Sequence, residues 1–330
     1  METNYYLGID VGGTKTEVAI MDEMGQVWGR GLSEGGNLHN CLFGDMIGNI
    51  EEAIRQAKID LAETIGDPFV IPGHVLRSGC IGLAGLDTRL DKSRIEDYLQ
   101  NKDEMWGLRE LYLVNDGVVA LRSGIEENRG VCLISGTGAN CYGICDDKEA
   151  KAGDWGYVLG DQGSGYALGR KILQQAMKEY DGREVNKLSM RVMDILGLSS
   201  LEELFEYVYR DEKGRVDEVA SLGQIVYEAD YKEDTFVKLV VGEMIDELVL
   251  AYRTVVKRLE LSGKFGVKLA GGMLRVNDYI VEELKNRIIE VTAEVSFVDL
   301  GVSPAWGAAK IARNPNLGGK NMIKKEFVTG

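Results

Sequence analysis

The residues with the clearest chemical potential near the start of the chain are an aspartate and the short turn that follows it. Asp10 ends an apolar run, and residues 12–16 read Gly-Gly-Thr-Lys-Thr before a second apolar run begins. Glycines let a backbone approach an anion, and successive N–H groups of a turn can bind phosphate. A carboxylate beside a phosphate requires a cation such as Mg²⁺ between them. The pattern predicts a phosphate-binding hairpin, although such a tip can also serve only the turn.

Two further aspartates follow apolar runs in the same half of the chain. The first 124 residues read as three strands followed by alternating helices and strands, which is typical of an α/β fold. Asp87 and Asp116 each come after an apolar run, as Asp10 does. Because ligands of such sheets lie beyond the carboxyl ends of strands, we expect three carboxylates at one sheet edge. The Asn-Asp-Gly sequence at 115–117 is also compatible with an ordinary turn.

The second half of the chain repeats the order of the first hairpin. An apolar run at 131–135 leads into Gly136-Thr137-Gly138, and a second run returns at 141–145 before two acidic residues. Two similar hairpins in one chain predict a duplicated fold with a cleft between the halves.

The glycine-rich segment 153–169 indicates a shaped loop, and the residues after it read as almost entirely helical. Asp161 could accept hydrogen bonds from sugar hydroxyls, or it could cap the helix predicted to begin near Ser164. Trp155 could line a site or anchor a core. The helical pattern from 164 to 262 predicts a helical insert within the second half.

The last part of the chain offers one more candidate site. A predicted strand at 267–270 leads into Gly271-Gly272, where adenine could lie on the backbone or an ordinary tight turn could form. A helix is predicted from Ser303, with Pro304 in its first turn. The polar segment 314–330 is expected to fray.

Composition narrows the classes of partner. The chain has 330 residues, which suggests two domains, and its net charge of −15 argues against nucleic acid or an anionic membrane. We see neither an apolar run of membrane-spanning length nor a signal-peptide pattern. The five cysteines form no C-x-x-C pair, which argues against a zinc site. Scattered cysteines of this kind fit a reducing cytoplasm. We therefore expect a cytoplasmic protein.

Together these motifs resemble those of the acetate and sugar kinase, heat-shock chaperone and actin superfamily. Within it, the set is similar to the N-acetylglucosamine kinase-like family, which also includes activator ATPases of 2-hydroxyacyl-CoA dehydratases and benzoyl-CoA reductases. The matching segments are 8–16, 115–116, 134–138, 155–164 and 269–272, and the resemblance spans about residues 5–312. It implies a duplicated ribonuclease H-like (actin-like ATPase) α/β fold, with two domains around a nucleotide cleft.

The resemblance implies a role for each matching residue. Asp116 would be the catalytic base, and Asp10 would hold Mg²⁺ through water. The implied ligands of the ATP phosphates are Gly12, Gly13, Thr14, Lys15, Thr16, Gly136, Thr137 and Gly138. The implied adenosine-binding residues are Gly271, Gly272 and Met273. The implied sugar-binding residues are Asn37, Asp116, Asn140, Trp155, Gly156 and Asp161, although an Asn in a loop such as Asn37 is often only a turn former.

These roles predict MgATP-dependent phosphoryl transfer to a hydroxyl of an amino sugar, with N-acetylglucosamine and its 6-phosphate as the preferred pair. The expected partner is a small-molecule sugar, and a homodimer is one assembly that the resemblance allows. The expected domains are 1–115, on which a C-terminal helix of about 303–330 packs back, and 116–302, which contains the insert of about 164–262.

Two departures from the family pattern concern the sugar and leave ATP use unaffected. Asp154 stands where sugar kinases are expected to have Gly, and Gln162 stands where Glu is common. The alternative function is the activator ATPase, a homodimer with an iron–sulfur cluster between its subunits. Because Cys132 and Cys141 lie in the strands and the tip between them has no cysteine, we rank it below the kinase. A nucleotide-switched binding protein ranks third.

Overall fold

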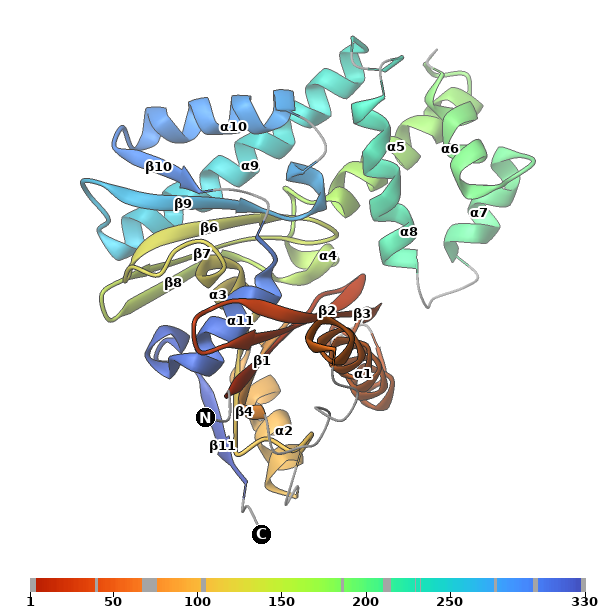
Figure 1. The fold of residues 1–330 in the computed structure, drawn as a ribbon. Helices are drawn as coiled ribbons and strands as arrows, with labels where there is room; N and C mark the ends of the chain where they lie inside the picture. The colour runs from red at the N-terminus through yellow and green to blue at the C-terminus, as the bar shows by residue number, and fades with distance from the viewer. Residues whose placement is uncertain are drawn as a thin grey trace. The chain divides into compact units, whose positions relative to one another are not determined.

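The chain forms two compact units in this computed structural model, and Figure 1 shows its elements coloured in chain order. The structure describes residues 4–38, 41–66, 76–101, 105–184, 187–209, 215–228, 230–231, 233–275, 278–298 and 302–327. Unit 1 comprises Met1–Cys132, Tyr142–Glu149 and Val298–Gly330, and unit 2 comprises Leu133–Cys141 and Ala150–Phe297. The domain boundary expected after residue 115 stays a prediction.

Unit 1 is built on a six-stranded sheet with the strand order β11-β5-β4-β1-β2-β3. The strands are β1 (Tyr5–Val11), β2 (Lys15–Asp22), β3 (Val27–Glu34), β4 (Leu76–Leu83), β5 (Glu110–Asn115) and β11 (Ile323–Glu326). β1 and β2 form the predicted antiparallel hairpin, whereas β4 pairs in parallel with both β1 and β5. The carboxyl ends of β1, β4 and β5 therefore lie at one edge of the sheet.

Local signals in the sequence explain where the helices of unit 1 begin and end. They are α1 (Phe43–Ile65), α2 (Arg89–Gln100), α3 (Asp116–Arg122) and α11 (Pro304–Arg313), followed by a 3-10 turn at Pro315–Gly318. Thr88 and Asp91 form a capping box for α2. Ser303 caps α11, and Pro304 is the first residue of that helix. The apolar stripe of α1, which includes Met46, packs against β3 and β2.

Glycines let α11 approach its neighbours in unit 1 at backbone distance. A Cβ added at Gly8 on β1 would lie 2.1 Å from the carbonyl oxygen of Ala305 and 2.3 Å from the amide of Ala309. A Cβ added at Gly307 would lie 2.0 Å from the carbonyl oxygen of Val119 on α3. Small residues on α11 thus place this helix directly between β1 and α3, the two elements that carry Asp10 and Asp116.

The second sheet has the order β10-β9-β6-β7-β8, and helices follow it in the chain. Its strands are β6 (Arg129–Ser135), β7 (Ala139–Cys145), β8 (Lys148–Gly153), β9 (Phe265–Ala270) and β10 (Val295–Val298). The helices are α4 (Gly156–Leu159), α5 (Gly165–Tyr180), α6 (Leu188–Leu196), α7 (Leu201–Tyr209), α8 (Arg215–Leu222), α9 (Thr235–Leu259) and α10 (Asp278–Val291). Two 3-10 turns lie at Gly223–Tyr227 and Gly272–Leu274. None of the helices in the described segments is long and apolar enough to cross a membrane.

Two expectations about local structure are wrong. The segment 314–330 was expected to fray, but β11 pairs antiparallel with β5, with Ile323 opposite Leu113. Its two lysines and its glutamate are typical of a protected edge strand and hide the strand signal. The segment from 153 to the helix predicted near Ser164 was expected to be a loop, but it contains α4, whereas α5 begins at Gly165 as predicted.

Replacing Gly8 with Ala is expected to lower the free energy of unfolding by about 1–3 kcal/mol, because the new methyl would overlap the α11 backbone. Urea denaturation measures the change. The matched control is Gly48→Ala on α1, where the added Cβ meets nothing within 4 Å and helix propensity improves. Equal stability of the Gly8→Ala protein and the wild type would show that α11 does not pack closely against β1 at Gly8.

Candidate functional site

The first tip, residues 12–16 between β1 and β2, presents open backbone at its glycines. The amide of Gly12 donates to the carbonyl of Lys15 at 2.9 Å and closes the turn. A Cβ added at Gly13 would meet nothing within 4 Å, so open space lies beside this exposed glycine. The side chain of Lys15 pairs with Glu17 at 2.7 Å. The tip therefore leaves room for an anion to approach its backbone.

The two threonines of the first tip differ in accessibility. Thr14 is exposed, whereas Thr16 is fully buried on β2 and its hydroxyl has no hydrogen-bond partner among the described residues. The hydroxyl that the tip offers to a ligand is therefore that of Thr14. Of the two threonines implied as phosphate ligands, the structure favours this one.

Asn37 lies in a loop that is held against the first tip. The amide of Gly36 donates to the carbonyl of Gly12 at 2.9 Å, and the amide of Leu38 donates to the carbonyl of Ala84 at 3.2 Å. These bonds on either side of Asn37 fix it between the first tip and the exit of β4. The structure thus brings Asn37 to the same edge of the sheet as Asp10.

The expected row of carboxylates along the carboxyl edge of the first sheet is present. Asp10 lies opposite Gly82, and Leu83 lies opposite Asn115, so β1, β4 and β5 end together. No group of three or more His, Cys, Asp or Glu side chains in the described segments is arranged to hold a metal ion. Mg²⁺ at Asp10 would fit this donor set, because Mg²⁺ often takes one carboxylate and completes its shell with water and phosphate.

Asp116 is the first residue of α3, and a short relay of hydrogen bonds orients it. Asn115 caps the helix: its Oδ1 accepts from the amide of Gly117 at 2.9 Å. The same amide donates to Oδ1 of Asp116 at 2.8 Å. On the other side, Nδ2 of Asn115 donates to Asp87 at 2.9 Å. The Asn-Asp-Gly sequence is therefore a helix start, not an isolated turn, and Asp87 holds the amide that caps it.

The second tip, residues 136–138 between β6 and β7, adjoins the predicted adenosine motif in unit 2. The amide of Gly136 donates to the carbonyl of Gly138 at 2.9 Å. Gly271 has a φ of +97°, and a Cβ there would lie 2.1 Å from the carbonyl oxygen of Ser135. A Cβ at Gly136 would lie 3.8 Å from the amide of Gly272. Only glycine at 271 allows this approach.

Met273 forms part of the wall beside the second tip. It is buried, its carbonyl accepts from the hydroxyl of Tyr227 at 2.6 Å, and its sulfur would lie 3.1 Å from a Cβ at Gly165. Met273 is therefore a packed side chain, and its contact with adenosine stays a prediction.

The glycine-rich segment places Asp161 beside the second tip and leaves Trp155 in solvent. A Cβ at Gly138 would lie 2.9 Å from Oδ2 of Asp161. The side chain of Ser164, not of Asp161, caps α5 by accepting from the amide of Ala167, so the capping alternative is wrong. Trp155 is 65% exposed, so the core alternative is also wrong. Both residues are available to a ligand.

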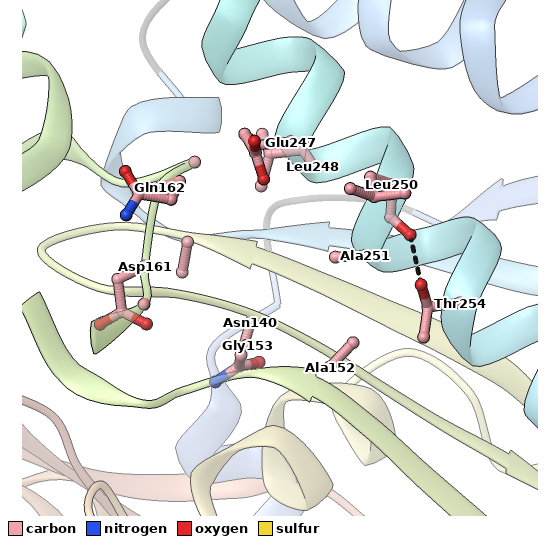
Figure 2. A pocket seen from close by; sticks show the side chains of 13 residues that line it. Asn140, Ala152, Gly153, Asp161, Gln162, Glu247, Leu248, Leu250, Ala251 and Thr254 are labelled. Carbon is pink, nitrogen blue, oxygen red and sulfur yellow. Dashed lines mark hydrogen bonds between the residues drawn. The ribbon is translucent and has the colours of Figure 1, made fainter.

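A cavity of about 240 Å³ in unit 2 contains Asp161 and Asn140 in its lining. Figure 2 shows these side chains below α9, with Leu248, Leu250 and Ala251 on the helix. Asn140 is only 5% exposed, and its Oδ1 and that of Asp161 are buried without a hydrogen-bond partner among the described residues. Both atoms are acceptors. The cavity therefore suits a ligand that brings O–H or N–H donors to the side of Asn140 and Asp161, while the α9 side is of mixed character, with Glu247 and Thr254 beside the apolar residues.

Burial and a neighbouring acid raise the pKa of Asp161 to about 6. Burial is the larger cause, and the charge of Asp154 adds to it, while backbone hydrogen bonding at Asp154 and Ala139 and then the charge of Lys151 lower the pKa. Lys151 pairs with Asp154 at 3.1 Å. Both aspartates have left-handed backbone, with φ of +65° at 154 and +59° at 161. Asp154, which stands where sugar kinases are expected to have Gly, therefore adds a negative charge that acts on Asp161 in the cavity.

Sequence reasoning missed the α9 side of this cavity. Glu247, Leu248, Leu250, Ala251 and Thr254 line it. Their spacing of three and four residues marks one face of a helix, but the same spacing marks any buried face. The sequence carried no signal that this face meets a loop some ninety residues earlier in the chain.

Asp161→Asn is expected to raise the free energy of unfolding at pH 7.5. Because the folded pKa is raised, the penalty for ionising Asp161 is absent below its ordinary pKa of 3.8 and complete above about 6. A rise from 3.8 to about 6 corresponds to at most about 3 kcal/mol, and solvent contact reduces this.

Urea denaturation at pH 4 and pH 7.5 measures this effect, with Glu51→Gln on the exposed face of α1 as the control. The gain should appear at pH 7.5 and shrink at pH 4. An Asp161→Asn protein less stable than the wild type at pH 7.5 would show that the native site stabilises the ionised carboxylate.

Comparison with known proteins adds relatives that span nearly the whole chain. Residues 7–312 match the sequence profile of the BadF/BadG/BcrA/BcrD ATPase family. An N-acetylmuramic acid/N-acetylglucosamine kinase of Clostridium acetobutylicum is 33% identical, covering 94% of this chain and 98% of the relative. An N-acetyl-D-glucosamine kinase of Dictyostelium discoideum is 29% identical, covering 95% and 99%.

Solved structures agree with the fold prediction. A candidate N-acetylglucosamine kinase from Chromobacterium violaceum matches with a TM-score of 0.74 at 20% identity, covering 94% of this chain and 100% of that one. The predicted α/β, actin-like ATPase fold is thereby confirmed.

Proposed function

This chain belongs to the BadF/BadG/BcrA/BcrD ATPase family, and on that premise we propose that it is a sugar kinase. The proposed reaction transfers a phosphoryl group from MgATP to a hydroxyl of an amino sugar, with N-acetylglucosamine as the preferred substrate and its 6-phosphate as the product. The observation that carries the proposal is the cavity of unit 2, in which Oδ1 of Asn140 and Oδ1 of Asp161 are buried acceptors that no donor in the described part of the chain satisfies. A sugar supplies hydroxyl donors, and an acetamido group supplies both an N–H donor and a methyl.

We assign to Asp116 the role of the general base that takes the proton of the sugar hydroxyl. Phosphoryl transfer needs a positioned nucleophile, charge neutralisation and little covalent help from the protein. Asp116 would accept the proton of the sugar hydroxyl. The capping bond, which the amide of Gly117 donates to Oδ1 of Asn115, would hold the start of α3 in place. Asn37, at the same sheet edge, would help to orient the sugar.

The glycine tips and the adenosine motif would hold the nucleotide. Gly12, Gly13 and Thr14 would offer N–H and hydroxyl donors to the phosphates, and residues 136–138 would do the same in unit 2. Gly271 and Gly272 would back the adenosine. Mg²⁺ held at Asp10 through water would neutralise charge that develops on the phosphoryl oxygens.

The choice of sugar is supported by the two curated relatives, whose names both include N-acetylglucosamine. The experiment is MgATP-dependent ADP release across N-acetylglucosamine, glucosamine, N-acetylmannosamine, glucose and N-acetylmuramic acid, on protein also assayed for iron. Saturable turnover with N-acetylglucosamine is the expected result. Slow hydrolysis that no sugar stimulates, in iron-bearing protein, would move the assignment to the activator ATPase. A homodimer and a cytoplasmic location stay predictions.

Asp116→Asn is expected to reduce kcat by about 10²–10⁴, the usual loss when a general base is removed. The KM for sugar and the Kd for nucleotide should change little, because Asn keeps the size of the side chain and its place on α3. Steady-state kinetics and nucleotide titration measure the two effects. The control is Glu110→Gln, which lies at the start of β5, the end of that strand away from Asp116. An unchanged kcat in Asp116→Asn would place the base elsewhere.

Gly13→Ala should fold normally and bind ATP at least about tenfold more weakly, because the added methyl fills the space in which a phosphate would approach the backbone. The control is Gly44→Ala on α1, where an added Cβ also meets nothing within 4 Å. Isothermal titration with MgADP and an ATP analogue gives the affinities. Wild-type affinity in Gly13→Ala would exclude the first tip as a phosphate site.

A further inference from the structure

The charges in the lining of the unit 2 cavity are all of one sign. Among the described residues that line it, the ionisable side chains are Asp161 on the glycine-rich segment and Glu247 on α9, and none is Lys, Arg or His. Burial is the main cause that raises the pKa of Asp161 to about 6, and at pH 7.5 this carboxyl group is still mainly ionised. A ligand in the cavity therefore meets two negative charges.

Glu247 belongs to the face of α9 that lines the cavity. Ala251 and Thr254 follow it by four and seven residues, so the three side chains share one side of the helix. Figure 2 shows Glu247 and Thr254 at opposite ends of this row, with Ala251 between them. Glu247 is exposed, and it makes no hydrogen bond or ion pair within the described part of the chain. One turn earlier, by contrast, Glu243 pairs with Lys171.

Two cationic side chains border this lining, and both are engaged. Lys151 pairs with Asp154 at 3.1 Å, so the two form a neutral pair. Arg258 lies one turn after Thr254 on α9, and its Nη1 donates to the backbone carbonyl of Lys151 at 2.8 Å. This arginine stands beyond the Thr254 end of the row, away from Glu247. The negative charge at the Glu247 end is therefore not offset.

The sign of these charges bears on which sugars the cavity accepts. Repulsion between like charges grows as a ligand displaces water from between them. A neutral sugar with an acetamido group meets no such repulsion, and its donors match the buried acceptors of Asn140 and Asp161. N-acetylmuramic acid is N-acetylglucosamine with an added lactyl ether that ends in a carboxylate. The two sugars thus differ by the kind of group that the lining repels.

We propose that Glu247 is a specificity-determining residue that, together with Asp161, excludes sugars that carry a carboxylate. The chain then discriminates against N-acetylmuramic acid in favour of the neutral N-acetylglucosamine. The proposal rests on the proposed function, because it requires that the sugar occupies the cavity of unit 2. It assigns to α9, which none of the sequence motifs includes, the selection of substrates by charge.

The test is binding of three sugars to the full chain at pH 7.5, measured by isothermal titration: N-acetylglucosamine, N-acetylmuramic acid and the methyl ester of N-acetylmuramic acid. The ester keeps the lactyl group and removes its charge. The wild type should bind the ester at least about tenfold more tightly than the acid, and Glu247→Gln should reduce this ratio about three- to tenfold.

The matched control is Asp246→Asn. It removes the same charge from the same helix, but Asp246 pairs with Arg287 of α10 and is not part of the lining. The ratio of the two affinities in this variant should equal that of the wild type.

Ionic strength gives a second readout that a steric effect would not change. Salt screens exposed charges over about 8–10 Å, so the preference of the wild type for the ester should shrink as salt is raised from about 0.02 M to about 0.5 M. In Glu247→Gln the dependence on salt should be weaker. A preference for the ester that salt leaves unchanged in the wild type would overturn the electrostatic origin of the selection.

The outcomes separate the two proposals. A wild type that neither binds N-acetylglucosamine nor releases ADP in response to any sugar would overturn the proposed function itself. Binding of N-acetylglucosamine, with equal affinities for the acid and the ester, would overturn the exclusion by charge alone. Failure of both the acid and the ester to bind would also overturn it, because the size of the lactyl group would then exclude them. An unchanged ratio in Glu247→Gln would remove Glu247 from this role.

Discussion

The parallel pairing of β4 with β1 and with β5 is the constraint on which the candidate site of unit 1 depends. It brings the ends of three strands into one register, so that Asp10 lies beside Gly82 and Asn115 lies beside Leu83. A slip of one residue would turn Asp10 to the other face of the sheet. The close approach of α11 at Gly8 opposes such a slip, because the helix backbone fits only a strand without a side chain at that point.

Two polar side chains in the cavity of unit 2 lower the stability of the fold, and packing alone does not explain why they are there. Asp161 is a half-buried acid with a raised pKa, and it adopts a left-handed backbone conformation. The nearby Asn140 leaves a buried acceptor without a partner among the described residues. Unsatisfied buried acceptors and strained backbone each cost of order 1–3 kcal/mol, so they concentrate where a ligand can satisfy them. Together they mark the cavity as a place where function was favoured over stability.

The sequence predicted the parts of the site that depend on short segments and missed the parts that depend on long-range packing. Residues 12–16 and 136–138 carry their glycines and threonines in one turn, so their conformation is a local matter. β8 and β11 were missed because their polar edge-strand sequences lack an apolar alternation, and their position comes from neighbouring strands. The packing of α8 on α5 had no local signal at all, because it joins segments that are far apart in the chain.

The acidic surroundings of the second tip bear on why a cation would be needed there. Asp161 lies next to Gly138, so a carboxylate adjoins a tip that offers neutral N–H and hydroxyl donors. Neutral donors can orient a phosphate, but they do not offset the repulsion between its charge and the adjacent acid. A divalent cation that arrives with the phosphates supplies that charge. The net charge of −15 acts in the same direction over a longer range. On this view the protein supplies the shape of the nucleotide site, and the metal ion supplies most of its positive charge.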